Sequence, residues 1–290
     1  MAHTHDGIDW PSRLEAMRRA VELDAPGHRT VAERLITLVP DGATVADIGP
    51  GAGGMSAALA GELAKRGGGT IVLVDAVPEL LVAAESAVHA ASDQVEVRAL
   101  RVDAASPDLG TMLSGVDLVW ASRVVHHLPD QRAGIAGLAG LLAGGGWLAV
   151  GEGGLPTRCL PWDIGVGRPG LIDRLCAAQT AWFADMRAAM DGSTRMPVGW
   201  TRALADAGLV ETFSFSYLTD HPAPGNELVR QSVVDWLAWV AGVAAERLDG
   251  QDQDSVVRLL DPNDPAYVGN RDDVFVLSAS TVHLGRKLSG

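Results

Sequence analysis

The sequence predicts an α/β protein with a doubly wound, Rossmann-like sheet of seven strands, mostly parallel with the last strand antiparallel, and with helical lid insertions. Three observations support this fold class. Apolar runs typical of buried strands alternate with helical patterns over residues 41–153. A glycine-rich turn joins the first apolar run to a helix. Acidic residues follow several of the runs, at the sheet edge where such folds bind ligands.

Residues 1–40 precede the first core strand and are expected to form an N-terminal helical cap. Ser12 and Glu15 have the spacing of a capping box, and so do Thr30 and Glu33. Apolar residues behind each box recur at helical spacing. The segment is therefore expected to contain two helices that pack on the sheet.

The first core strand ends in a glycine-rich turn in which Gly49, Gly51 and Gly54 satisfy the G-x-G-x-x-G spacing. Residues without side chains let the backbone approach a ligand, and the helix that follows presents its free N–H groups there. The chain has 34 glycines, so the cluster also fits a turn that merely joins a strand to a helix. Asp47, two residues before the first glycine, favours a site for a nucleotide-like cofactor.

The next strands continue the pattern of an apolar run followed by an acid. The run at residues 70–74 ends in Asp75, where a carboxylate can hold two ribose hydroxyls. The run at residues 95–100 leads into Asp103, and the run at 116–120 leads into a segment that contains two histidines. Because carboxyl ends of parallel strands meet at one edge, these side chains are expected to lie together.

On these residues, the segment 41–153 resembles the class I S-adenosylmethionine-dependent methyltransferases. The resemblance implies that the acid-and-glycine loop holds the methionine part of S-adenosylmethionine, that Asp75 binds the ribose, and that Asp103 meets the adenine. It also implies S-adenosylhomocysteine as the product, and that the first helix closes over the site. The cofactor-binding residues implied in this way are Asp47, Gly49, Gly51, Gly53, Asp75, Ala76, Asp103, Ala104 and Ser122.

Asp47 also has a physical reason to lie at the turn. Its carboxylate can accept backbone N–H bonds or act on the ammonium group of S-adenosylmethionine. A nicotinamide dinucleotide would place a pyrophosphate at this turn, where a carboxylate is unfavourable. An NAD-dependent oxidoreductase stays as an alternative. A methyltransferase-fold protein that uses the cofactor as a scaffold, for a non-methylating reaction or for regulation, is another.

The predicted reaction is methyl transfer to an O or N atom of a small hydrophobic or aromatic metabolite by in-line displacement. Alignment and exclusion of water supply much of the acceleration, because the leaving group is already good. A hydroxyl acceptor would also need a base, and His126 and His127 are the candidates because imidazole titrates near neutral pH. The alternative is that these rings pack against or cap the following turn.

The C-terminal half, residues 154–290, is expected to complete the same sheet. Further strands are predicted at residues 146–152, 211–218 and 273–284. Two segments outside the minimal sheet, about 155–199 and 222–270, are expected to be lids. The candidates for contact with the substrate are Trp10, Arg123, Glu152, Trp162, Trp182 and His221. For each of these residues considered alone, a structural role in core packing, in an ion pair or in a loop is an equally good explanation.

Composition narrows the possible partners. The formal net charge is −13, from 36 acidic residues against 23 Lys and Arg, which argues against a nucleic acid substrate. A small molecule is therefore the expected methyl acceptor, and no oligomeric state is predicted. With no apolar stretch long enough for a bilayer and no signal-peptide pattern, the sequence indicates a cytoplasmic protein without a membrane partner.

Cysteine and histidine usage predicts no metal site. Cys159 and Cys176 are expected to be reduced thiols. His3 and His5 form a short pair at the terminus that lacks the other residues of a metal site.

Overall fold

The computed structural model describes residues 9–290, whose strands form one seven-stranded sheet. His3 and His5 lie outside the described residues. The chain divides into two compact units. The first unit contains the described residues up to Gly153, Asp191–Tyr217 and Ser280–Gly290, and the second contains Gly154–Met190 and Leu218–Ala279.

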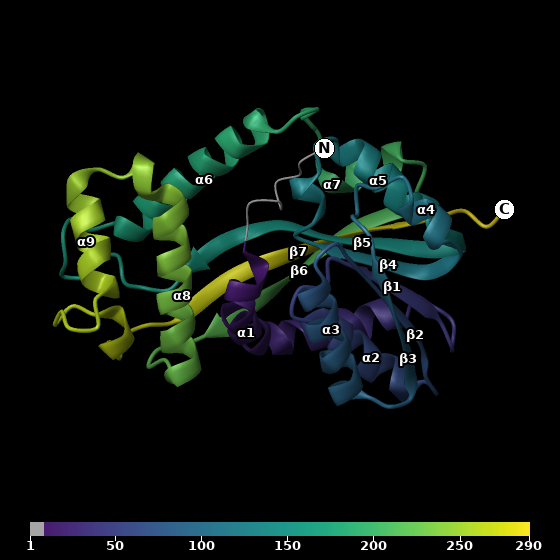
Figure 1. Ribbon diagram of the computed structural model, residues 1–290, viewed down its shortest axis with the longest axis horizontal. Helices are drawn as coiled ribbons and strands as arrows, with labels where there is room; N and C mark the ends of the chain where they lie inside the picture. Colours follow the sequence, from purple (N-terminus) through teal and green to yellow (C-terminus); the bar gives the residue numbers. More distant parts are fainter. Residues whose placement is uncertain (1–8) are drawn as a thin grey trace. The chain divides into compact units, whose positions relative to one another are not determined.

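The elements alternate between strands and helices along most of the chain (Figure 1). The strands are β1 (Thr44–Ile48), β2 (Gly69–Asp75), β3 (Val95–Arg101), β4 (Val116–Ser122), β5 (Leu142–Arg158), β6 (Val210–His221) and β7 (Val276–Arg286). The helices are α1 (Trp10–Ile36), α2 (Gly54–Lys65), α3 (Pro78–Ala91), α4 (Leu109–Met112), α5 (Gln131–Gly140), α6 (Leu171–Ala189), α7 (Trp200–Asp206), α8 (Glu227–Ala244) and α9 (Gly250–Leu260). Short 3-10 turns lie at Val125–His127, Ala245–Arg247 and Val268–Asn270.

The strand order is β3-β2-β1-β4-β5-β7-β6, and the first five strands in sequence pair in parallel. The order reverses between β1 and β4, which places a switch point at the carboxyl end of β1. β7 runs antiparallel to β5, because the Lys287 N–H donates to the Gly146 carbonyl (2.8 Å) and the Gly145 N–H donates to the Lys287 carbonyl (2.9 Å). The predicted doubly wound sheet with an antiparallel last strand is therefore confirmed.

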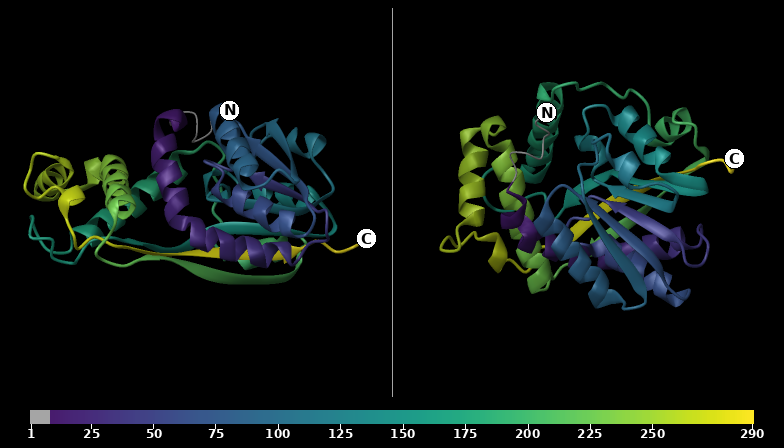
Figure 2. Two further views of the ribbon diagram at one scale, coloured as in Figure 1. Left: turned by 90° about the horizontal axis from the view of Figure 1, so that it is seen from below. Right: turned by 45° about the vertical axis from the view of Figure 1, so that its right-hand side comes forward.

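In the first unit, helices cover both faces of the sheet (Figure 2). Val45 of β1 packs with buried residues of α1, α2 and α3 on one face. Ala46 and Ile48 pack with residues of α4, α5 and α7 on the other. This alternation follows from the two-residue period of a strand. Because these strands are buried on both faces, they read as the continuous apolar runs noted in the sequence.

The N-terminal segment forms one continuous helix rather than the two that were expected. Its N-cap is Asp9, whose Oδ1 accepts the Ser12 N–H (3.3 Å), so Ser12 is not the cap. Thr30 lies inside the helix, where its hydroxyl donates to the Pro26 carbonyl (3.2 Å). The helix continues through Pro26 because the next turns bury Val31 and Leu35 against the sheet. That burial outweighs the roughly 3 kcal/mol that an interior proline costs.

The last three strands differ in their bounds from the prediction. β5 and β6 are longer than predicted, and β7 begins and ends later in the chain. β5 begins four residues before and ends six residues after the predicted 146–152 (142 against 146, and 158 against 152). β6 extends past the predicted 211–218 to His221, and β7 begins at Val276 rather than at 273. Cross-strand pairing extends these elements, and such partners are remote in the sequence.

The second unit packs α6 and α8 against each other, with α9 beside α8. Leu171 and Leu175 of α6 are buried, as are Val233 and Leu237 of α8. Just after the end of β5 and just before the start of β7, the Phe275 N–H donates to the carbonyl of the buried Cys159 (3.2 Å). Cys159 and Cys176 are free thiols. Over residues 9–290, no helix combines the length and the hydropathy needed to cross a bilayer.

Candidate functional site

The glycine turn between β1 and α2 is closely packed and depends on left-handed backbone. Gly49 has φ +68° and Gly53 has φ +82°. A Cβ added at Gly49 would lie 2.6 Å from Val124 Cγ2, and one at Gly53 would lie 2.6 Å from Ala84 Cα. Side chains at these positions would therefore clash as well as strain the backbone. Gly51 stands between them in the same left-handed region, with φ +57°.

Asp47 lies behind this turn, with only 2% of its surface exposed. Its Oδ2 accepts a hydrogen bond from the Ser56 hydroxyl of α2 (2.5 Å). Burial raises the pKa of Asp47 to about 7; the Ser56 hydrogen bond acts in the opposite direction, and the charge of Asp75 adds to the rise. A cation bound near this carboxyl would favour its ionised form.

Asp75 is the last residue of β2, and Asp103 lies two residues beyond the end of the parallel strand β3, at the same edge of the sheet. Asp75 Oδ1 accepts the Val77 N–H (2.9 Å), and Asp103 Oδ1 accepts the Ala105 N–H (2.7 Å). Burial raises the pKa of Asp75, backbone N–H groups of Val77 and Ala76 oppose this, and Asp103 adds to it. The charge of Asp75 thus affects the pKa of Asp47, and the charge of Asp103 affects the pKa of Asp75. The three carboxylates therefore lie close enough to form one group.

A second polar group is formed by the 3-10 turn after β4 and by Glu152 inside β5. His126 Nδ1 is 2.6 Å from Oε2 of Glu152, which is only 4% exposed, and the His126 backbone N–H donates to Oε1 (3.3 Å). This contact fixes the orientation of the His126 ring and leaves Nε2 as the ring nitrogen away from Glu152. The His127 ring centroid is 4.1 Å from that of His126. His283 Nε2 lies 3.0 Å from the Glu152 carbonyl oxygen.

Ser122 and Arg123 occupy the end of β4. The Ser122 hydroxyl is 3.4 Å from the Gly151 carbonyl oxygen, which also accepts the Arg123 N–H (3.0 Å). Arg123 has φ +56°, in the left-handed region that bulky residues rarely adopt. Its side chain is exposed. The residue that follows is Val124, which packs against Gly49 of the turn.

Helix α1 lies against the glycine turn. A Cβ on Gly51 would be 3.0 Å from Met17 Cε, and one on Gly54 would be 2.6 Å from Val21 Cγ1. Trp10 begins this helix, and the guanidinium carbon of Arg13 is 5.7 Å from its ring centroid. The helix that was expected to close over the site therefore contacts the turn that forms it.

Two residues of α1 that were not among the candidates from the sequence, Asp24 and His28, also lie near the glycine turn. They continue the helix face of Met17 and Val21, since residues 17, 21, 24 and 28 are spaced by three or four. His28 Nδ1 is buried, makes no hydrogen bond within the described structure, and lies 3.1 Å from where a Cβ on Gly54 would be. Polar residues on a face that is otherwise apolar were the signal that could have found them.

Three candidates for substrate contact belong to the second unit, so the site described above is built without them. Trp162 is 70% exposed, and its carbonyl accepts the Gly170 N–H (2.6 Å). Trp182 lies on α6, and His221 is the last residue of β6. Their role toward a substrate stays a prediction.

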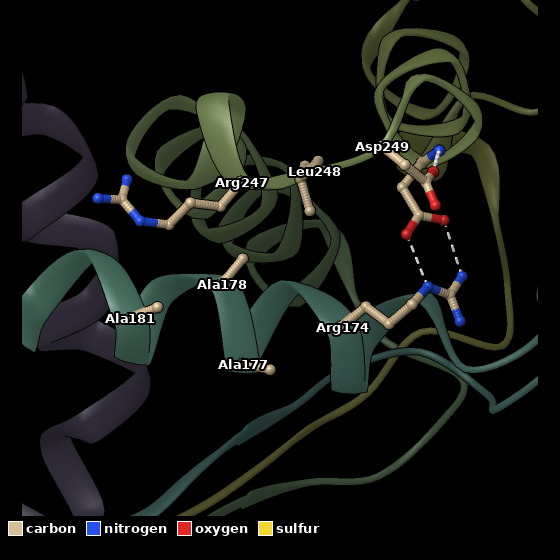
Figure 3. A pocket seen from close by; sticks show the side chains of 8 residues that line it. Arg174, Ala177, Ala178, Ala181, Arg247, Leu248 and Asp249 are labelled. Atoms are coloured by element: carbon tan, nitrogen blue, oxygen red, sulfur yellow. Dashed lines mark hydrogen bonds and ion pairs between the residues drawn. The ribbon is translucent and has the colours of Figure 1, made fainter.

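The second unit also contains a cavity of about 350 Å³ between α6 and the start of α9 (Figure 3). Ala177, Ala178 and Ala181 of α6 line one side. Arg174 Nε and Nη2 hold the buried Asp252 of α9 through both carboxylate oxygens (2.6 and 2.8 Å). The charged groups here hold helices together. Among residues 9–290, no group of three or more His, Cys, Asp or Glu is placed to hold a metal ion.

The strand order and the glycine turn after β1 together define a Rossmann-like fold. Residues 46–148 match a family model described as a methyltransferase domain. Residues 46–148 therefore form a methyltransferase domain, and the enzyme class of the chain is that of the S-adenosylmethionine-dependent methyltransferases. No curated protein sequence matches it.

Solved structures share the fold at low identity. One is a protein from Anaeromyxobacter dehalogenans described as a candidate type II methyltransferase, with 17% identity and a TM-score of 0.53, covering 90% of this chain and 97% of that one. Another is an O-methyltransferase family protein from Burkholderia thailandensis, with 17% identity and a TM-score of 0.50, covering 99% of this chain and 61% of that one. At such identities the likeness concerns the fold.

Proposed function

We propose that this methyltransferase transfers the methyl group of S-adenosylmethionine to an O or N atom of a small hydrophobic or aromatic molecule. The observation that carries the proposal is the group of three carboxylates, Asp47, Asp75 and Asp103, around the glycine turn. A cationic cofactor suits this acid-rich edge, whereas a pyrophosphate would be repelled by it. When bound, S-adenosylmethionine supplies an electrophilic methyl group on a sulfonium that is a good leaving group.

The protein's own groups have separate parts in this proposal. The turn residues Gly49, Gly51 and Gly53 let the backbone reach the methionine part, with Asp47 behind them and Ser122 at the adjoining strand end. The two oxygens of Asp75, beside Ala76, suit a ribose diol. Asp103 and the backbone of Ala104 suit the adenine. In this proposal each of the three carboxylates acts from its own position, near the carboxyl end of β1, β2 or β3.

His126 is the proposed base for an acceptor that must lose a proton. With Nδ1 held by Glu152, Nε2 is the nitrogen that would take the proton as the new bond to the methyl group forms. The buried carboxylate of Glu152 fixes the ring and stabilises the imidazolium. His127, whose ring lies beside that of His126 at an angle of 46°, is the second candidate. An amine acceptor would need only to be uncharged.

The acceptor is proposed to be a small molecule rather than a nucleic acid. The net charge of −13 opposes binding of a polyphosphate chain. The eight tryptophans of the chain favour flat or apolar compounds.

Calorimetric titration with S-adenosylhomocysteine, with NAD as the control, tests the proposed function. Binding of S-adenosylhomocysteine alone is expected, followed by methyl transfer from labelled S-adenosylmethionine to a panel of phenols and amines. Asp75→Ala should weaken the binding of S-adenosylhomocysteine by roughly 1–3 kcal/mol, because the contacts with the ribose are lost. Asp93→Ala, an exposed acid, is the matched control and should bind normally. Binding of NAD alone would overturn the proposal.

A further inference from the structure

Glu152 contacts two histidines, and the proposed function uses only one of them. Its carboxylate oxygens contact His126, at 2.6 Å from the ring nitrogen Nδ1 and at 3.3 Å from the backbone nitrogen. Its backbone carbonyl oxygen lies 3.0 Å from Nε2 of His283, on the neighbouring strand β7. His283 therefore belongs to the same group of side chains, although it has no part in the chemistry proposed above.

The contact with the carbonyl determines the hydrogen-bonding state of the His283 ring. A backbone carbonyl can only accept, so Nε2 of His283 donates to it. Burial lowers the pKa of His283, while the carbonyl and the charge of Glu152 act in the opposite direction, so the ring is neutral at pH 7. Nδ1 is then a bare acceptor, and it is buried without a hydrogen bond within residues 9–290. A side chain that only filled space would avoid this cost, so the imidazole requires an explanation beyond packing.

The backbone of Glu152 lies at the point where the burial of β5 ends. Residues 146–152 of this strand are buried, whereas Gly153 is exposed and has φ +75°, outside the extended region. Packing therefore restrains β5 on the amino side of Glu152 much more than on its carboxyl side. A hydrogen bond to the Glu152 carbonyl supplies a restraint at this transition.

His283 is supported by rigid surroundings. Its neighbours in β7, Val282 and Leu284, are fully buried in the core of the first unit. The ring of Trp200, the first residue of α7, lies beside the imidazole, with 6.3 Å between the ring centroids. A side chain that is supported in this way can hold its hydrogen-bond partner at a nearly constant position.

We propose that His283 is a positioning residue, which holds the Glu152 backbone so that the carboxylate meets His126. The inference rests on the proposed function, because it concerns the base proposed there. A displacement of Glu152 by about 1 Å would lengthen the 2.6 Å contact to about 3.6 Å, beyond the range of a hydrogen bond. Misplacement on this scale can lower a rate by about 10²-fold. Loss of the His283 hydrogen bond should therefore weaken the action of His126 and spare the cofactor.

Replacement of His283 by two amides of different length tests the proposal. Glutamine can place an N–H near the position of Nε2 and donate to the Glu152 carbonyl, whereas asparagine is one methylene shorter and does not reach it. His283→Asn should lower kcat toward a phenolic acceptor about 10- to 100-fold, with KM and the Kd for S-adenosylhomocysteine nearly unchanged. His283→Gln should keep nearly the activity of the wild type. Full activity of the asparagine variant, or equal losses in both variants, would overturn the proposal.

His89→Asn, which changes an exposed histidine of α3, is the matched control and should behave as the wild type does. A double-mutant cycle then separates positioning from an independent effect. If His283 acts through His126, adding His283→Asn to His126→Ala should cause no further loss of kcat. A further loss of more than about twofold would contradict the positioning role.

Amide hydrogen exchange tests the positioning without cofactor or acceptor. The His126 backbone N–H donates to Oε1 of Glu152, so its exchange reports whether the carboxylate is in place. In the ligand-free protein, His283→Asn should speed this exchange about 5- to 10-fold, and His283→Gln should leave it nearly unchanged. Unchanged exchange in both variants would overturn the proposal. If the wild-type protein transfers no methyl group, the proposed function fails, while the exchange of this amide still decides the role of His283.

Discussion

Asp47 is the residue whose environment departs most clearly from that of a surface acid. Its pKa of about 7 lies above the value near 4 of an unfolded chain. The folded state therefore binds this proton more tightly. The stability that results is fully present below about pH 4 and is lost as the pH rises through 7. The ligand-free protein should consequently become less stable across this window on account of Asp47.

Asp47→Asn tests this pH dependence. The amide can still accept the Ser56 hydrogen bond but does not titrate. Relative to the wild type, the variant's free energy of unfolding should rise between pH 4 and pH 8, by at most on the order of 4 kcal/mol. Urea unfolding at a series of pH values measures it, with Asp93→Asn as the control. A difference that stays constant with pH would contradict the buried, proton-retaining carboxyl.

His126 carries a second prediction at the scale of the residue. His126→Ala should lower kcat toward a phenolic acceptor by about 10²- to 10⁴-fold and leave the Kd for S-adenosylhomocysteine unchanged, because the ring acts on the acceptor's proton. His89→Ala, an exposed histidine of α3, is the control for both constants. Full activity of the His126 variant over the whole pH range would exclude a base at this position.

Among the elements, helix α2 begins at a position where only glycine fits without strain. Gly53 is the N-cap of this helix in left-handed conformation, and a Cβ there would meet Ala84 of α3. Gly53→Ala should therefore lower the free energy of unfolding by more than 1 kcal/mol. Gly61→Ala in the same helix, where a Cβ meets open space, should raise it by roughly 0.5–1 kcal/mol. Thermal unfolding of the two variants measures the contrast.

Sequence analysis predicted the elements best where local pattern decides them. β1, β2 and β4 are buried on both faces, so each of them can be recognised in the sequence as a continuous apolar run. The single helix α1 could not be foreseen, because the capping pattern at Thr30 is local while the burial of Leu35 is not. Likewise, Arg123 comes near the α1 residues Asp24 and His28 only through the fold, so no spacing in the sequence joins it to them.

At the scale of the whole molecule, the two units contain carboxyls with opposite pH behaviour. Asp252 of the second unit is buried, and its pKa is lowered, mainly by hydrogen bonds from Arg174 with Arg168 adding to them. A depressed pKa contributes stability above the unfolded value, and this stability is lost as the pH falls through the folded value. Acid should therefore weaken α9, whereas the Asp47 contribution in the first unit is greatest in acid.

Asp252→Asn tests the second half of this contrast. The variant should be less stable than the wild type at pH 7, and the difference should shrink as the pH falls below about 4. Hydrogen exchange of the amides in α9 reports it locally. Asp254→Asn changes an exposed acid of the same helix and should exchange as the wild type does at every pH.

The boundary between the two units passes through β5, β6 and β7 themselves, at Gly153, Tyr217 and Ala279. Proteins built from modules are usually joined at exposed linkers, where a gene can be cut and rejoined without breaking a hydrogen-bonded ladder. Here three of the junctions would sever paired strands. A chimera that takes the second unit from a relative must therefore match the register of the strands as well as their length.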